Sequence, residues 1–98
     1  MAPRQVVFRP QAVDDALEVQ AWYESRRPGL GREFGQLLDT LVARIAANPG
    51  MFQRVHGETR RAVMSRFPYA VYFRSVDEHV VVLAIHGRQQ PSRWKSRT

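Results

Sequence analysis

Two neighbouring apolar segments in the second half of the chain have the composition of β-strands. Residues 69–76 and 79–86 are rich in Val, Ile, Tyr and Phe, and the polar pair Asp77-Glu78 separates them as a short bend. Residues 60–64 alternate more loosely and are followed by a second bend at residues 65–68. The pattern predicts a three-stranded antiparallel meander.

Apolar residues fall on both faces of this expected sheet. Strict alternation places Tyr69, Val71 and Phe73 opposite Ala70 and Tyr72, and Val81, Leu83 and Ile85 opposite Val80, Val82 and Ala84. An antiparallel sheet with one face in water alternates apolar and polar residues, so this sheet is expected to be covered on both faces.

The N-terminal half has the apolar spacing of helices. A short strand at residues 4–9 ends at Pro10, where a helix is expected to begin and to stop by Arg27, before Pro28-Gly29. Asp14 and Asp15 are expected near the positive end of its dipole. The apolar stripe of this helix is formed by Ala12, Ala16, Val19 and Tyr23.

The second helix has the clearest periodicity of the chain. Its core-facing stripe is Phe34, Leu37, Leu38, Leu41 and Ile45, and Asn48-Pro49-Gly50 ends it. The connection between the helices is short, so they are expected to form an antiparallel hairpin. Residues 51–58 show no period and are predicted to be a loop. The fold class is therefore α+β, with two layers: an N-terminal strand, a helical hairpin and the meander in one sheet.

Length and composition limit the classes of protein. The 98 residues suffice for one domain, expected to span residues 1–98 with a basic tail at residues 89–98. There is no cysteine and no apolar run near the roughly 20 residues that cross a membrane, so we expect a cytoplasmic protein. The net charge is +6, and 14 of the 15 basic residues are arginines, which suits an anionic partner. A solvated basic surface is the alternative.

The candidate chemistry is sparse. The chain has no glycine-rich phosphate loop, no zinc-protease motif and no glycine-flanked serine. His56, His79 and His86 lack metal-ligand spacing, so neither a metal site nor a cofactor is expected. His79 is expected in solvent at a turn. His86 ends the last strand beside Arg88, where it is either a partly exposed histidine with a backbone hydrogen bond or a functional group.

Arginines gather at the strand ends and bends of the meander. On one edge they could form a basic surface with aromatic rings for stacking. The arginines are Arg60, Arg61, Arg66, Arg74, Arg88, Arg93 and Arg97, and the rings are Tyr69, Tyr72 and Trp94. Trp94 is expected either to fold back onto the core or to make an exposed contact, and the first is favoured.

The order of these elements and several short sequence words resemble the RelE/ParE superfamily of small bacterial toxins, in particular its ParE, or plasmid-stabilisation, branch. The words are Phe8-x-Pro10-x-Ala12, Trp22-Tyr23-Glu24, Pro28-Gly29-Leu30-Gly31-x-x-Phe34, Ile45-x-x-x-Pro49, Arg60-Arg61-Ala62, Arg66-Phe67-Pro68-Tyr69-x-Val71-Tyr72 and His86-x-Arg88-x-x-Pro91-x-x-Trp94. They extend over nearly the whole chain, and their order is more specific than any single word.

The resemblance implies the toxin of a type II toxin–antitoxin system, silenced by a ParD-like antitoxin whose C-terminal segment wraps around it. In the ParE branch the target is DNA gyrase and the toxin is not an enzyme. The RelE branch implies the alternative, an endoribonuclease that cuts mRNA on the ribosome. A bare module that binds nucleic acid is a third interpretation.

Residue chemistry favours the first of these interpretations. A ribonuclease would need a base, an acid and a cation, which Arg61, Arg66, His86 and Arg88 could supply, with Glu58 as a second proton acceptor. The ribonuclease branch has a C-terminal tyrosine and a lysine cluster, whereas this tail has Trp94 and a single Lys95. Without catalysis, the residues expected to bind the target or the antitoxin are Arg60, Arg61, Arg66, Tyr69, Tyr72, Arg88, Arg93 and Trp94.

Overall fold

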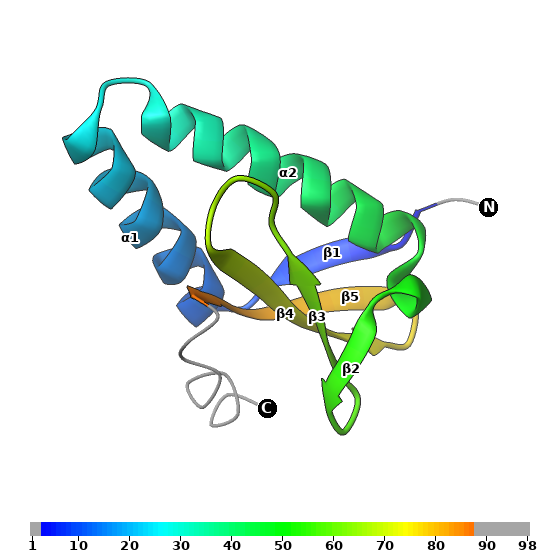
Figure 1. The fold of residues 1–98 in the computed structure, drawn as a ribbon. Coiled ribbons are helices and arrows are strands. Elements are labelled where there is room, and N and C mark those ends of the chain that lie inside the picture. Colours follow the sequence, from blue (N-terminus) through cyan, green and yellow to red (C-terminus); the bar gives the residue numbers. More distant parts are fainter. Residues whose placement is uncertain (1–2, 88–98) are drawn as a thin grey trace.

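A computed structural model describes residues 3–87 of the chain (Figure 1). The elements in order are β1 (Gln5–Phe8), α1 (Pro10–Arg26), α2 (Leu30–Ala47), a short 3-10 helix η1 (Pro49–Met51), β2 (Gln53–His56), β3 (Thr59–Val63), β4 (Tyr69–Val76) and β5 (His79–Gly87). The α+β fold and the antiparallel helical hairpin are confirmed. α2 lies across one face of the sheet, and α1 lies beside the C-terminal end of β5.

The sheet has five strands in the order β1-β5-β4-β3-β2. The predicted meander is its β3-β4-β5 part, but the sheet is mixed because β1 pairs with β5 in parallel. The prediction of a loop at residues 51–58 was wrong in part, since residues 53–56 form β2 at the edge of the sheet. This strand is four residues long and its pairing register with β3 shifts between Arg54 and His56, so it has no readable period.

A β-bulge in β5 changes which side chains face the helices. Tyr72 pairs with Ala84 but Phe73 pairs with Val82, so Leu83 is an extra residue. Strict alternation, which placed Val81, Leu83 and Ile85 on one face, was therefore wrong for this strand. The structure places Ile85 in the same cluster as residues 80 and 82, while Ala84 belongs to the opposite face.

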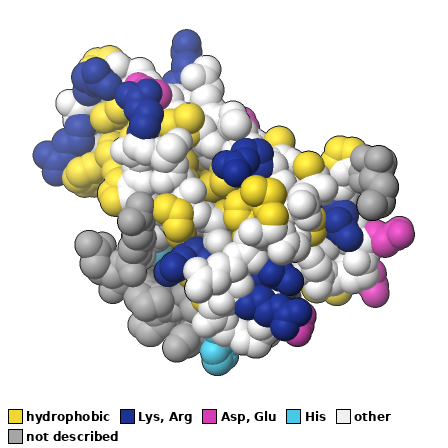
Figure 2. Space-filling view, turned by 45° about the vertical axis from the view of Figure 1, so that its right-hand side comes forward, with side chains coloured by type: hydrophobic (Ala, Val, Ile, Leu, Met, Phe, Trp, Pro, Cys, Tyr) yellow, Lys and Arg dark blue, Asp and Glu magenta, His cyan; other side chains and the backbone are white. Residues whose placement is uncertain are grey.

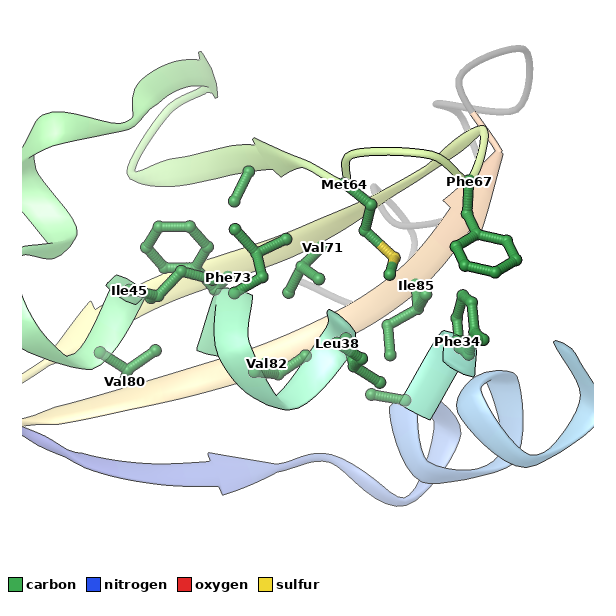
Figure 3. Close-up of a cluster of buried hydrophobic side chains, with 13 residues drawn as sticks. Phe34, Leu38, Ile45, Met64, Phe67, Val71, Phe73, Val80, Val82 and Ile85 are labelled. Atoms are coloured by element: carbon green, nitrogen blue, oxygen red, sulfur yellow. The ribbon is translucent and has the colours of Figure 1, made fainter. Parts of the chain in front are cut away.

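The main core lies between α2 and the sheet (Figure 3). Leu38, Leu41 and Ile45 are buried on the sheet-facing side of α2, as the predicted stripe requires, and Leu37 is partly buried. Figure 3 shows α2 side chains pointing toward those of β4 and β5. The strand side of this cluster includes Val71, Phe73, Val80, Val82 and Ile85.

The second face of the sheet is also buried at its centre. Ala70, Tyr72 and Ala84 are all 0 % exposed, and Val55 from β2 packs against them. The expectation that both faces are covered is confirmed for these positions. Tyr72, a candidate binding residue, is therefore a core side chain.

Glu24 joins the two helices at the tip of the hairpin. Its Oε2 accepts the Gly29 N–H at 2.9 Å and its Oε1 accepts the Gly31 N–H at 3.0 Å, at the first turn of α2. These two hydrogen bonds, the Gly29 one first, hold the pKa of the Glu24 carboxyl below its ordinary value. Gly29 has a φ of 89°, which glycine adopts without a Cβ clash. None of the helices in the described part of the chain is both long and apolar enough to cross a membrane.

Candidate functional site

The C-terminal end of β5 meets α1 at a buried pair of polar side chains. β1 accompanies β5 only as far as Val82, and beyond this point α1 lies alongside β5. The Asp15 Oδ2 accepts the backbone N–H of Ile85 at 3.0 Å, and it lies 3.7 Å from the His86 Nε2. Asp15 is 7 % exposed and His86 is 4 % exposed. The Asp15 carboxylate of α1 therefore accepts a backbone N–H of β5 in the region that β1 does not reach.

Both residues differ from their expected environments. His86 was expected to be partly exposed, yet it is buried beside a carboxylate. The helix begins at Pro10 as predicted, but Asp15, which was expected to act at the positive end of its dipole, lies in the second turn and faces β5. Burial of a carboxylate requires hydrogen-bond partners, and the Ile85 N–H is one of them.

A pocket of about 220 Å³ opens next to this pair. Its α1 wall includes Asp15, Glu18 and Trp22, and its sheet wall includes Tyr69 and His86. The spacing of the helix residues, i, i+3 and i+7, places them on one stripe. Sequence reasoning missed this stripe because it followed only the apolar one, although the same periodicity applied to polar residues would have revealed it.

An aromatic cluster supports the pocket from the side of the core. The Tyr23 ring makes edge contacts with the rings of Trp22, Phe67 and Tyr69, with centroids 4.9, 4.8 and 6.2 Å apart, and it stacks on Phe34 at 6.0 Å. Burial, followed by the neighbouring Tyr69, raises the pKa of the Tyr23 hydroxyl. Tyr69 is therefore positioned by the core and contributes to the pocket as well.

Three of the predicted arginines, Arg60, Arg61 and Arg66, lie in the described part of the chain in different surroundings. The Arg60 Nη1 donates to the Phe52 carbonyl oxygen at 2.6 Å, so this side chain supports the connection into β2. Arg66 has a φ of 71° and forms an ion pair with Glu33, which also lies 3.6 Å from Arg27. Arg61 is half-buried and pairs in register with Tyr72.

The remaining candidates lie apart from these. Glu58 is exposed and forms an ion pair with Arg54 at 3.9 Å. His79 is exposed, as expected, with its Nε2 3.1 Å from the Gln5 Oε1. The predictions for Arg88, Arg93 and Trp94 fall outside the described residues. Figure 2 shows basic side chains in several separate groups over one face, with hydrophobic side chains between them.

A second, more apolar hollow of about 240 Å³ lies between the two helices. Val13, Ala16 and Leu17 of α1 line it, together with Gly35 and Leu38 of α2. Leu17 is 58 % exposed and Val13 is 42 % exposed. These side chains form an apolar surface on the helical hairpin. Among residues 3–87, no cluster of three or more His, Cys, Asp or Glu side chains is placed to hold a metal ion.

Comparison with known proteins gives consistent matches. The family model described as the ParE toxin of the type II toxin–antitoxin system parDE matches residues 6–91. The toxin ParE2 of Mycobacterium tuberculosis is 28% identical over 81 residues, which cover 81% of this chain and 77% of that protein.

Solved structures share the fold at low sequence identity. A chain of the chromosomal ParDE toxin–antitoxin system of P. aeruginosa superposes with a TM-score of 0.77 at 15% identity, covering 86% of this chain and 95% of that one. A chain of the M. tuberculosis toxin–antitoxin complex RelBE2 gives 0.63 at 19% identity, over 89% of this chain and all (100%) of that one. A mutant of the E. coli toxin RelE in the free state gives 0.67 at 15% identity, over 98% and 94%.

Proposed function

This chain belongs to the ParE toxin family of type II toxin–antitoxin systems, and from that premise we propose that it inhibits DNA gyrase by binding rather than by catalysis. We further propose that a cognate ParD-like antitoxin neutralises it in the cytoplasm. The proposed toxin domain spans residues 1–98.

The environment of His86 is the observation that carries the proposal of binding without catalysis. A general acid or base must come within hydrogen-bond reach of the substrate proton. The imidazole of His86 is 4 % exposed and its Nε2 faces the carboxylate of Asp15 across 3.7 Å. His86 lines the neighbouring pocket, but its Nε2 is directed at Asp15, which already engages the nitrogen that would transfer a proton. The arrangement therefore supports a structural role for His86.

The arginines also support binding over chemistry. The guanidinium group of Arg60 is engaged with a backbone carbonyl and that of Arg66 with Glu33, so both cations already have partners within the chain. The net charge of +6 nevertheless favours association with an acidic protein surface or with nucleic acid. Gyrase binding uses this charge without requiring a proton transfer.

The apolar surface on the helical hairpin supports the proposed antitoxin contact. An amphipathic segment could place its apolar side chains between α1 and α2, against Val13 and Leu17. The M. tuberculosis structure with the same fold is of a toxin–antitoxin complex. For this chain, a candidate antitoxin is the product of a short neighbouring gene with a ribbon-helix-helix N-terminus and an amphipathic C-terminal tail, because such a tail becomes ordered on binding.

The antitoxin contact can be tested with two matched variants. A charge introduced by Leu17→Glu in the hollow should weaken the complex at least about tenfold, which corresponds to about 1.4 kcal/mol. Val76→Glu makes the same kind of change at a residue of similar exposure, 46 %, at the end of β4, and should leave the affinity unchanged. Equal affinities of the two variants, measured by calorimetry, would place the antitoxin elsewhere.

The activity can be tested with the free toxin in two parallel assays. The proposal expects inhibition of gyrase supercoiling and intact mRNA in a translation extract. His86→Gln, which retains most of the side-chain volume in its buried site, should still inhibit gyrase. The RelE-type alternative, which the shared fold keeps open, expects mRNA cleavage that His86→Gln lowers by about a hundredfold or more. Circular dichroism of the variant provides the control for folding, and a toxin that binds nucleic acid but leaves both gyrase and mRNA unaffected would support the third interpretation.

A further inference from the structure

The pocket between α1 and the end of β5 has two carboxylates in its lining, with His86 beside the inner one. Asp15 lies at its buried side and Glu18 at its exposed side, both from one stripe of α1. The chain as a whole carries a net charge of +6, so two carboxylates in one hollow form a local acidic site. Acidic partner residues would be repelled here, whereas a cation would be attracted.

The aromatic walls of the pocket favour the same kind of ligand. Trp22 is 49 % exposed, and the guanidinium carbon of Arg26 lies 4.5 Å from the centroid of its ring. This contact shows that the Trp22 ring accepts a guanidinium group by a cation–π interaction. Tyr69 lines the other side of the same hollow, so a planar cation would have an aromatic ring on each side.

The size of the pocket limits what can enter. Sites for drug-sized ligands enclose about 300–1,000 Å³, and this one encloses about 220 Å³. One long side chain fits such a volume. A guanidinium group suits it better than an ammonium group, because it is planar, is more weakly hydrated and can donate to both a carboxylate and a neighbouring acceptor.

We propose that this pocket is an anchor site for one arginine side chain of a partner protein. The guanidinium group lies between Trp22 and Tyr69 and donates to Glu18 at the rim, with Asp15 adding to the negative potential. The arginines of the toxin itself would instead attract acidic residues of a partner. Its chemistry does not depend on whether gyrase or the ribosome is the target.

The test uses the blocked tripeptide Ac-Gly-Arg-Gly-NH₂ as the probe and the full-length free toxin. The matched control is the same peptide with citrulline, which has nearly the same shape as arginine but no charge. One exposed ion pair together with one cation–π contact implies a dissociation constant on the order of 10–100 mM. We expect ¹H–¹⁵N chemical-shift changes at the indole of Trp22 and at the amides of Ile85 and Gly87, with much smaller changes for citrulline.

Two variants separate a local site from general charge attraction. Glu18→Gln should weaken binding of the arginine peptide by about two- to fivefold, the range for an exposed ion pair. Asp14→Asn removes one negative charge from an exposed residue of α1 that is not among the pocket-lining residues, and it should leave the affinity within about 1.5-fold. The proposal would be overturned if the citrulline peptide caused equal chemical-shift changes, or if both variants weakened binding of the arginine peptide equally. It would also be overturned by shift changes confined to residues outside the pocket. The absence of any shift change would overturn it as well, and is the result expected if basic residues of the chain itself filled the pocket.

Discussion

The close approach of the two helices makes a sharp prediction for a pair of glycines in α2. A Cβ atom added at Gly31 would lie 2.6 Å from the backbone oxygen of Gln20, and 3.0 and 3.1 Å from two atoms of Glu24. A Cβ added at Gly35 would instead meet the side-chain Nε2 of Gln20. The first obstacle is backbone in α1, whereas the second is the end of a flexible side chain.

The expected free energies follow from this difference. Overpacking against a fixed neighbour costs about 1–3 kcal/mol. Alanine is favoured over glycine in a helix interior by about 1 kcal/mol, but Gly31 is the second residue of α2, so it gains less of this amount. Gly31→Ala should therefore lower the free energy of unfolding by about 1–3 kcal/mol. Gly35→Ala should leave it unchanged or raise it by up to about 1 kcal/mol, because Gln20 can change rotamer.

The two variants can be compared by urea denaturation and by thermal melting, both followed by circular dichroism. A change of 1 kcal/mol shifts the melting temperature of a domain of this size by about 4–8 °C, so the difference between the variants is easily measured. The argument would be refuted if Gly31→Ala were as stable as the wild type, or if Gly35→Ala were destabilised to the same extent. Either result would mean that the helices can separate at this point at little cost.

Three further stability predictions depend on single contacts. Leu41→Ala should lower the free energy of unfolding by about 2–5 kcal/mol in urea titrations, because the side chain is buried under the sheet, whereas the exposed Leu17→Ala should change it by less than about 0.5 kcal/mol. The folded-state pKa of Glu24 is lowered, so its hydrogen bonds stabilise the protein above the unfolded-state pKa of 4.5, and this contribution is lost as the pH falls through the folded-state pKa. Urea midpoints measured between pH 7 and pH 3 should therefore fall less steeply for Glu24→Gln than for the wild type, and parallel curves would contradict this. The folded-state pKa of Tyr23 is raised above 10.0, so its contribution is complete below pH 10.0 and is lost as the pH rises through the folded-state value. Tyr23→Phe should remove this alkaline loss, and an unchanged dependence of the urea midpoint on alkaline pH would argue against the raised pKa of Tyr23 that its burial and Tyr69 produce.

Much of the fold could be predicted from the sequence because its signals are local. The stripe that includes Leu38 and Leu41 determined the phase of α2, and Pro28-Gly29 marked the end of α1. The apolar composition of residues 69–76 identified β4 with its observed bounds. In each case the signal lies within one element, because the residues that face the core recur with the period of that element.

The candidate site was less predictable because its residues lie on separate elements. Asp15 and His86 are 71 positions apart in the sequence, and their pairing depends on where β1 ends and α1 takes its place beside β5. No local sequence pattern indicates that α1 replaces β1 as the neighbour of β5 at this point. The contacts of two predicted arginines depend on the tertiary structure in the same way: Arg60 donates to a backbone carbonyl oxygen and Arg66 forms an ion pair with Glu33 of α2.

The family, the helical hairpin, the meander and the positive charge could be read from the amino-acid sequence, since they follow from residue order, period and composition. The parallel pairing of β1, the strand at residues 53–56 and the bulge at Leu83 became visible in the folded chain. The physical reason is that a strand pairing is satisfied by a partner distant in sequence, and one extra residue exchanges the two faces of a strand. That exchange places Ile85 in the helix-facing core and His86 opposite Ala70, next to the acidic pocket of α1.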